Sequence, residues 1–275
     1  MEKVLKSVVQ VSDLTQIRAN NPILIFSFYM GNIATTKCPY IDAGIFAYPL
    51  SHTTTNRMVL TARNLGFNGF IMREPWLRDA TASLHSFSHF TEQKKDFFLI
   101  HGRVYSTLNQ KELRRAIQSM AIVSSAKIPT LHIVDAGDIA YNRWVLTTPD
   151  VSILSRIYAV PRKAFDHVCA RSAFDHNICV DINLAALIPK GVLRQKALRQ
   201  YEHIVTLARK YEFGLTISSG AAGHLGLCTP REIMAICLLF GMDEDMVVHS
   251  LSTPFHLLHP HQSVREVVSE QRGVR

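Results

Sequence analysis

Short apolar runs alternate with longer segments of helical periodicity through most of the chain. Runs of this length, bounded by turn-forming residues, are typical of buried β-strands. We predict strands at residues 40–45, 69–72, 97–104, 130–134, 151–154, 178–182 and 215–219. Strand and helix follow one another about seven times, an order that predicts parallel strands joined by right-handed crossovers.

Three of the intervening helices are marked by the residues at their ends. The sequence Asn-Gln-Lys-Glu at 109–112 is a capping-box pattern, which predicts that a helix begins there. A second helix is predicted over 192–211, with Gly214 as the residue that stops it. Thr-Pro-Arg-Glu at 229–232 combines an N-cap with a proline in the first turn and predicts a third helix, which ends near Gly241.

The number of strand–helix units decides the fold class. Roughly seven units in about 235 residues fit a closed (β/α) barrel better than an open doubly wound sheet. No low-complexity linker divides this part of the sequence. We therefore predict one TIM-like barrel domain over 39–260, with an N-terminal extension at 1–38 and a C-terminal tail at 261–275.

Composition adds a preference for polyanionic partners. The 275 residues include 30 Lys or Arg and 22 Asp or Glu, which gives a net charge of +8 and a pI near 9.4. The five cysteines have no CxxC or Cys/His ligand spacing, which is typical of reduced thiols in a cytoplasmic protein. The apolar run at 22–30 is far shorter than the about 20 residues of a membrane span, so we expect no membrane contact.

The basic residues are concentrated in one stretch. Residues 187–231 contain seven Lys or Arg against two Glu, and several of these cations gather at the start of the helix predicted at 192–211. Positive charge there opposes the helix macrodipole. A phosphate partner would explain the placement, and a solvated face explains it almost as well. Four arginines near strand ends could also reach a phosphate: Arg73, Arg103, Arg143 and Arg156.

A glycine-rich segment, Gly-Ala-Ala-Gly-His-Leu-Gly at 220–226, follows the last predicted strand. It lacks the Lys-Ser/Thr of a P-loop, and we favour a tight connection over a phosphate cradle. The serines just before it could donate hydrogen bonds to a phosphate. The candidate RNA contacts are therefore Arg73, Arg103, Arg143, Lys190, Arg194, Lys196, Arg199, Ser218, Ser219, His224 and Arg231.

Thirteen histidines raise the alternative of a metal centre. Barrels of the polymerase and histidinol phosphatase type hold metal ions with a His-x-His pair at the first strand, and the first strand predicted here has none. A free-standing metal-dependent phosphoesterase would have to use His101, His132, Asp42 and Asp135, which are scattered along the chain. We predict neither a metal centre nor a catalytic side chain, and keep this phosphoesterase as the alternative.

From residue 40 to about 258 the sequence resembles the ribonuclease P protein component 3 family, the archaeal counterpart of the eukaryotic thirty-kilodalton subunit. Most specific is the combination of a serine pair, a helix-initiating Pro-Arg and a Leu-Phe-Gly at fixed spacing. The matching segments are VDAGD at 134–138, continuing through NR at 142–143 to PDVSILS at 149–155, FDHV at 165–168, VDINL at 180–184, LTISSGA at 215–221, LCTPRE at 227–232 and LLFGM at 238–242.

The resemblance implies a subunit of ribonuclease P, the ribonucleoprotein that removes the 5′ leader from precursor tRNA. It implies a barrel related to the metal-dependent phosphatase barrels but without their ligands, and catalysis by the RNA subunit with Mg²⁺. The implied partners are the catalytic RNA, protein component 2 and other protein subunits, with precursor tRNA touched indirectly. Gly220 and Cys228 stand where more polar or basic residues are common in the family.

A third interpretation needs no RNA contact. The positive charge could meet an acidic protein in a pure assembly scaffold, which would survive nuclease treatment of the complex.

Overall fold

We describe a computed structural model of the chain over residues 39–46, 53–76, 97–106, 108–123 and 130–258. All of these residues belong to one compact unit. The extension predicted at 1–38 and the tail predicted at 261–275 lie outside the described residues.

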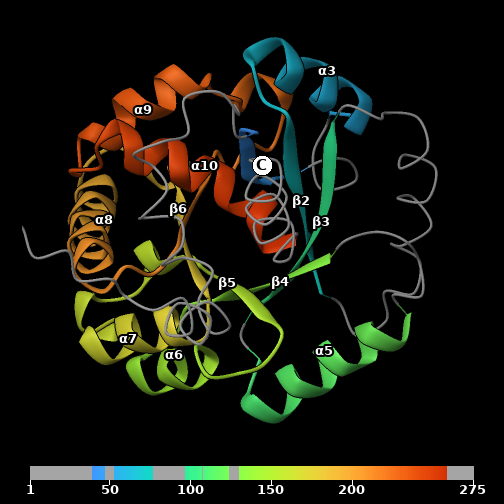
Figure 1. The fold of residues 1–275 in the computed structure, drawn as a ribbon. Coiled ribbons are helices and arrows are strands. Elements are labelled where there is room, and N and C mark those ends of the chain that lie inside the picture. Colours follow the sequence, from blue (N-terminus) through green and yellow to red (C-terminus); the bar gives the residue numbers. More distant parts are fainter. Residues whose placement is uncertain (1–38, 47–52, 77–96, 107, 124–129, 259–275) are drawn as a thin grey trace, which may run out of the picture. The chain divides into compact units, whose positions relative to one another are not determined.

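The described residues form a single parallel sheet whose strands lie in chain order (Figure 1). The strands are β1 (Ile41–Ile45), β2 (Gly69–Pro75), β3 (Phe98–Tyr105), β4 (Thr130–Asp135), β5 (Val151–Ser155), β6 (Cys179–Asn183) and β7 (Leu215–Ser218). Backbone N–H groups of Gly220 and Phe46 donate to the carbonyls of Gly44 and Ala221, at 3.0 and 2.9 Å. These bonds join the carboxyl ends of β1 and β7, so the sheet is nearly closed into a barrel. Each predicted strand is confirmed.

Helices surround the strands (Figure 1). They are α3 (Thr55–Leu65), α5 (Gln110–Val123), α6 (Ile139–Val145), α7 (His167–Asp175), α8 (Val192–Tyr211), α9 (Pro230–Leu238) and α10 (Glu244–Leu258). Short 3-10 turns follow several strands: η1 (Ile157–Ala159), η2 (Arg162–Ala164), η3 (Leu184–Leu187) and η4 (His224–Gly226). No helix in the described ranges has the length and apolar character to cross a membrane.

The predicted helix starts are confirmed, and so is the end of the second helix at residue 211; the third helix ends at Leu238, three residues before Gly241. Asn109 and Glu112 exchange backbone-to-side-chain hydrogen bonds at the start of α5, and a full capping box begins α9. α8 stops before Gly214 because Glu212 adopts the left-handed conformation, with φ 59°, and its N–H bonds to the helix. α9 ends at Leu238, ahead of a turn through Gly241 at φ 90°.

The barrel interior is apolar at its amino end. Inward side chains form a buried cluster of Ile41, Ala43, Ile71, Ile100, Leu131, Ile133, Ile153 and Cys179. The last turn of α10 packs against this cluster, and Phe255 meets Phe98, the first residue of β3, ring to ring at 5.1 Å. A β-carbon at Gly102 would come within 2.5 Å of Ile71, so glycine is needed for this packing. With α10 against the amino end, the carboxyl end is left for binding.

Candidate nucleic-acid interface

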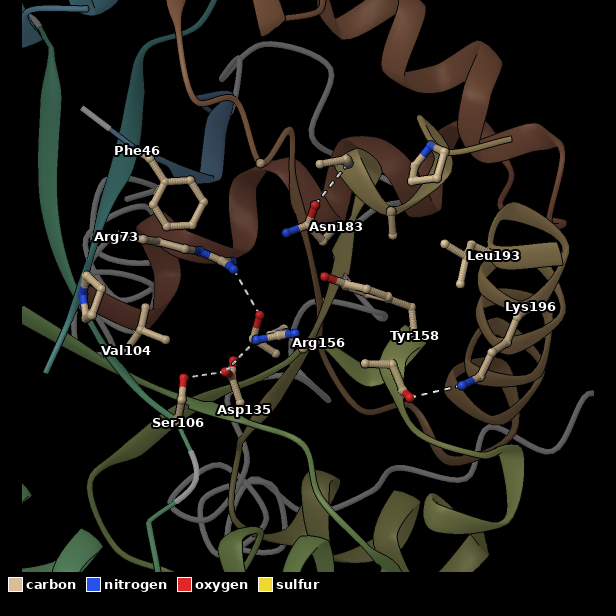
Figure 2. A pocket seen from close by; sticks show the side chains of 17 residues that line it. Phe46, Arg73, Val104, Ser106, Asp135, Arg156, Tyr158, Asn183, Leu193 and Lys196 are labelled. Carbon is tan, nitrogen blue, oxygen red and sulfur yellow. Dashed lines mark hydrogen bonds and ion pairs between the residues drawn. The ribbon is translucent and has the colours of Figure 1, made fainter. Parts of the chain in front are cut away.

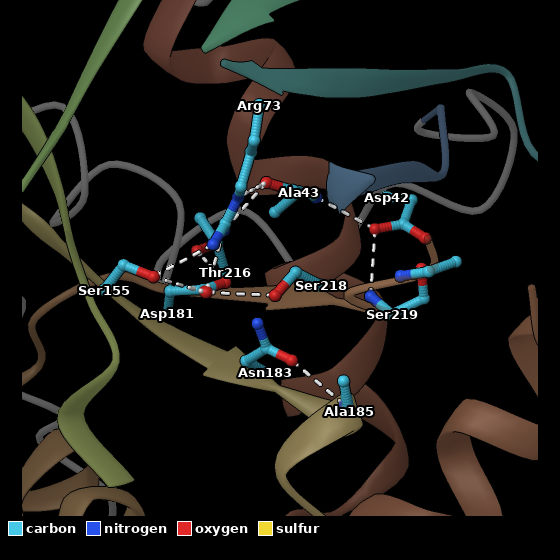
Figure 3. A network of polar contacts seen from close by, with 12 residues as sticks. Asp42, Ala43, Arg73, Ser155, Asp181, Asn183, Ala185, Thr216, Ser218 and Ser219 are labelled. Atoms are coloured by element: carbon cyan, nitrogen blue, oxygen red, sulfur yellow. Dashed lines mark hydrogen bonds and ion pairs between the residues drawn. The ribbon is translucent and has the colours of Figure 1, made fainter. Parts of the chain in front are cut away.

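A layer of polar side chains lies inside the barrel above the apolar cluster (Figure 3). The Arg73 guanidinium from β2 pairs with Asp181 of β6 at 2.8 Å and donates to the Ala43 carbonyl at 2.9 and 3.0 Å. It also donates to the Ser155 hydroxyl at 2.9 Å. The Ser218 hydroxyl donates to Asp181 at 2.9 Å. Both charges are therefore compensated within the barrel, as buried ions require.

Space for the Arg73 guanidinium depends on Gly44 in β1. A β-carbon at this position would lie 2.1 Å from Arg73 Nε, well inside van der Waals contact. Glycine at this position therefore lets an arginine occupy the centre of the barrel. The guanidinium puts a cation among the strand ends, where Asp181 pairs with it.

A cavity of about 620 Å³ opens above this layer, at the carboxyl end of the strands (Figure 2). Ligands of (β/α) barrels bind at this end, because the loops that follow the strands converge there. Three cations from separate elements line the cavity: Arg73, Arg156 and Lys196. The neutral part of the lining includes Phe46 and Tyr158.

Asp135, the last residue of β4, provides the acidic group of this pocket. Its Oδ2 accepts from the Ser106 hydroxyl at 2.5 Å and lies 3.5 Å from Arg156. Its Oδ1 has no hydrogen-bond partner among the described residues. Burial raises the pKa of the Asp135 carboxyl, against the lowering effect of Ser106 and Arg156.

Asn183, the last residue of β6, is held in a fixed orientation at the pocket wall. Its Oδ1 accepts from the Ala185 N–H at 3.0 Å, and its amide nitrogen donates to no residue in the described part of the chain. Gly220 closes over it with φ +64°, and a β-carbon there would lie 2.5 Å from Asn183 Oδ1. The Gly220 position therefore requires a residue with no side chain, in agreement with the predicted tight connection.

The predicted basic cluster lies on the surface beside this pocket. Lys190, Arg194, Lys196 and Arg199 are all exposed around the start of α8. Arg194 donates to the carbonyls of Ile188 and Pro189 at 3.0 Å, and Lys196 donates to the Ala159 carbonyl at 3.1 Å. Carbonyls do not neutralise charge, so the whole cluster keeps its positive charge toward solvent.

Apolar side chains are exposed among these cations. Ile188, Val192 and Leu193 are 72%, 78% and 65% exposed. The start of α8 is thus both basic and apolar, a combination found in surfaces that bind partners.

Four of the predicted contacts are buried rather than displayed. Arg73 and Ser218 belong to the interior layer, and the Ser219 hydroxyl accepts from the Ala221 N–H at 3.2 Å. Arg103 lies on the outer face of β3, with NH1 3.4 Å from the Pro75 carbonyl oxygen. In this conformation these side chains serve the fold, although Arg73 also lines the pocket.

The remaining predicted contacts are accessible but dispersed. Arg143 is partly exposed and pairs with Asp166 at 2.5 Å. His224 is half-buried, with Nδ1 3.3 Å from the Thr53 hydroxyl. Arg231 is exposed on α9. Of the residues named in the sequence analysis as possible phosphate contacts, Arg73, Lys196 and Arg156 line one pocket.

Sequence reasoning missed Asn183, Ser155 and Tyr158 as pocket residues. Asn183 and Ser155 are the last residues of β6 and β5. A polar residue directly after a buried strand of a barrel was the available signal, since strand ends point into the mouth.

The residues of the alternative metal site do not converge. His101 and His132 point away from the barrel axis, His101 to Glu74 at 3.2 Å and His132 to the Tyr105 hydroxyl at 2.8 Å. Asp42 accepts from the N–H groups of Gly44 and Ser219, while Asp135 lies at the mouth. Burial lowers the pKa of His132. The described residues contain no group of three or more His, Cys, Asp or Glu placed to hold a metal ion.

Two curated proteins from archaea are similar in sequence to most of this chain. Ribonuclease P protein component 3 of Methanothermobacter thermautotrophicus is 29% identical over 229 residues, which cover 82% of this chain and 90% of the relative. The same component of Methanococcoides burtonii is 26% identical over 239 residues, covering 84% and 92%.

Two solved structures share the fold. A chain in the cryo-EM structure of archaeal ribonuclease P with mature tRNA aligns with a TM-score of 0.61 and 20% identity, covering 79% of this chain and 89% of that one. Histidinol phosphate phosphatase from Lactococcus lactis, complexed with zinc, L-histidinol and phosphate, aligns with a TM-score of 0.55 and 9% identity, covering 72% and 94%. The predicted TIM-like barrel is confirmed, and its fold is similar to that of this phosphatase.

The family is shown by a match over most of the sequence. The model of the family described as RNase P subunit p30 matches residues 28–265, a wider span than the resemblance seen at 40–258. The predicted family is therefore confirmed, and this chain is a member of the RNase P subunit p30 family.

Proposed function

We propose that this chain is an RNA-binding protein subunit of ribonuclease P that supports its catalytic RNA in removing the 5′ leader from precursor tRNA. The observation that carries the proposal is the family match over residues 28–265. Its partners are the catalytic RNA, protein component 2 and other protein subunits, in the cytoplasm. Precursor tRNA is touched indirectly, and Mg²⁺ acts with the RNA subunit.

Catalysis by the RNA is supported by the chemistry of the described residues. The barrel centre holds the Arg73–Asp181 ion pair, and the described residues contain no group of three or more His, Cys, Asp or Glu placed to hold a metal ion. Burial raises the pKa of the thiols of Cys169, Cys179 and Cys237 to about 11, about 12 and about 12, so they are not nucleophilic near neutral pH. This chain therefore contributes surface and charge rather than a reacting group.

The exposed cations around the start of α8 are the surface best suited to RNA. They lie on one helix end and its preceding loop, and none of Lys190, Arg194, Lys196 and Arg199 is paired with a carboxylate among the described residues. Long, flexible cations of this kind contact phosphates without reading sequence.

Binding of the catalytic RNA as a function of salt tests this surface. We expect the logarithm of affinity to fall with the logarithm of salt, with a slope of about −0.7 to −0.9 for each phosphate contacted. The triple variant Arg194→Gln, Lys196→Gln and Arg199→Gln should weaken binding and flatten that slope.

A charge-matched control separates local contact from total charge. Arg171→Gln, Arg209→Gln and Lys210→Gln remove three exposed cations from α7 and the far end of α8. This control should bind RNA nearly as well as the parent chain. Equal losses in both triple variants, or a flat salt response, would contradict the assignment of the surface. A chain that binds an acidic partner but no RNA would favour the scaffold interpretation.

A further inference from the structure

The pocket at the barrel mouth has more positive charge than its own carboxylates balance. Arg73 is fully engaged with Asp181 at 2.8 Å. Arg156 is 54% exposed and only loosely paired with Asp135, at 3.5 Å. Lys196 has a carbonyl as its partner, and no carboxylate pairs with it in the described part of the chain. The barrel mouth therefore carries two cations that could meet an anion: Lys196, which no described carboxylate balances, and Arg156, which Asp135 balances only in part.

Arg156 is held at this position against its backbone preference. Its φ of 55° lies in the left-handed region, where glycine is the favoured residue. Strain of this kind collects at functional sites, because the side chain is needed where the backbone would prefer glycine. The strained turn directs the Arg156 side chain over the cavity, between Asp135 and Tyr158 (Figure 2).

An amide and a carboxylate complete the hydrogen-bonding groups of the pocket. The Ala185 N–H fixes the oxygen end of the Asn183 amide, so its NH₂ is a donor available at the cavity wall. Asp135 supplies the opposite function, because its carboxylate lines the cavity as a hydrogen-bond acceptor; its Oδ1 is buried and has no partner among the described residues. A ligand that suits both has an anionic group and a hydroxyl donor close together.

Aromatic and apolar side chains form the rest of the lining. Phe46 and Tyr158 reach the cavity from opposite sides in Figure 2, and Leu193 borders it near Lys196. Tyr158 is itself packed edge-on against the buried Tyr201 ring, at 6.3 Å between centroids. A sugar or base can lie against such surfaces while a phosphate meets the cations.

We propose that the barrel mouth binds one ribonucleotide unit, with its phosphate on Arg156 and Lys196 and its ribose directed toward Asp135. The cavity of about 620 Å³ is large enough for one such unit. The same chemistry is present in a free nucleotide and in a strand of RNA. If the nucleotide belongs to a strand of RNA, this proposal rests on the proposed function, which supplies that RNA.

Titration of the isolated full chain with three probes tests the site. The probes are inorganic phosphate, adenosine 5′-monophosphate and a short oligoadenylate without a terminal phosphate, followed by calorimetry. We expect the ribonucleotide probes to bind more tightly than inorganic phosphate. Stronger binding of the monophosphate would identify a free nucleotide as the ligand, and stronger binding of the oligoadenylate would identify an internal RNA phosphate.

Two variants link this binding to the pocket. Arg156→Gly and Lys196→Gln should each weaken binding of the preferred probe about tenfold, the loss of one charge-assisted hydrogen bond. Because glycine suits the left-handed backbone, Arg156→Gly should keep its thermal midpoint within about 4 °C of the parent chain. Lys210→Gln, at the far end of α8, is the matched control and should bind normally.

The result that overturns the proposal is a parent chain that binds none of the probes, or pocket variants that bind as well as the control. That result leaves the proposed function standing if precursor-tRNA cleavage still depends on the chain. Conversely, precursor-tRNA cleavage at the same rate with and without the chain would contradict the proposed function. Even then, nucleotide binding by the parent chain that is lost in Arg156→Gly would establish the pocket as a binding site.

Discussion

At the scale of single residues, the Arg73–Asp181 ion pair is the charged contact that joins β2 to β6 across the barrel interior. A buried ion pair adds little net stability, but removing one partner leaves an uncompensated charge in the interior. Asp181 would then keep only hydroxyl donors, from Ser155, Thr216 and Ser218, for its negative charge.

Arg73→Met should therefore lower the free energy of unfolding by about 3–5 kcal/mol, measured by chemical denaturation. The double variant with Asp181→Asn should recover part of this loss, because it removes the stranded charge. A single variant within about 1 kcal/mol of the parent chain would mean that the pair does not organise the barrel.

Asp42 gives the fold a pH dependence of its own. Burial raises the pKa of Asp42 from 3.8 to about 6, in spite of hydrogen bonds from Ser219 and Gly44 and the charge of Arg73. Between pH 3.8 and about 6, the Asp42 carboxyl keeps its proton in the folded chain and releases it in the unfolded chain. The Asp42 contribution to stability is therefore greatest in acid and falls as pH rises toward 6, by about 3 kcal/mol in total.

Asp42→Asn should abolish this contribution, since asparagine keeps an oxygen for the Gly44 and Ser219 N–H groups and does not ionise. The stability of the variant relative to the parent chain should rise between about pH 4 and 6 and then stay level. Thermal midpoints of both proteins across this range measure the difference. A difference independent of pH would contradict the raised pKa.

At the scale of helices and strands, sequence reasoning succeeded where the signal is local. The start of α9 is specified by its own first residues, since Thr229 caps the Glu232 N–H and Glu232 returns the bond to the Thr229 N–H. Each strand contains several buried apolar residues, as expected for strands that lie between the barrel interior and the helices.

Thr229→Ala tests this local control. It removes the cap hydrogen bonds of α9 and should cost about 1 kcal/mol, or a few degrees in thermal midpoint. Thr229→Ser keeps the hydroxyl oxygen and should stay close to the parent chain. If both variants unfold at the same temperature, the cap does not stabilise α9.

Sequence reasoning failed where the partner is distant along the chain. Arg73 follows an apolar run, and its neighbours in the sequence give no sign that it is buried. Its ion-pair partner, Asp181, is more than a hundred residues away along the chain and is brought close only by the folded barrel. The residue that stops α8 was also not identified: the helix ends at residue 211 as predicted, but Glu212 and not Gly214 takes the left-handed conformation that glycine normally provides. The pocket itself combines β2, β4, β5, β6 and α8, so only the closed barrel assembles it.

At the scale of the whole molecule, one end of the barrel is packed for stability and the other end is left for binding. α10 and the apolar cluster fill the amino end, whereas the carboxyl end carries the pocket and the exposed cations of α8. A net charge of +8 supports association with a polyanion over long range, and this attraction weakens as salt screens it.

Reconstitution of ribonuclease P from its RNA and protein subunits, with and without this chain, tests the central claim most directly. We predict that precursor-tRNA cleavage rises when the chain is added, that it requires the RNA subunit, and that the chain alone cleaves nothing. Hydrolysis of precursor tRNA by the purified chain without RNA, abolished by substitutions at the barrel mouth, would contradict a supporting role.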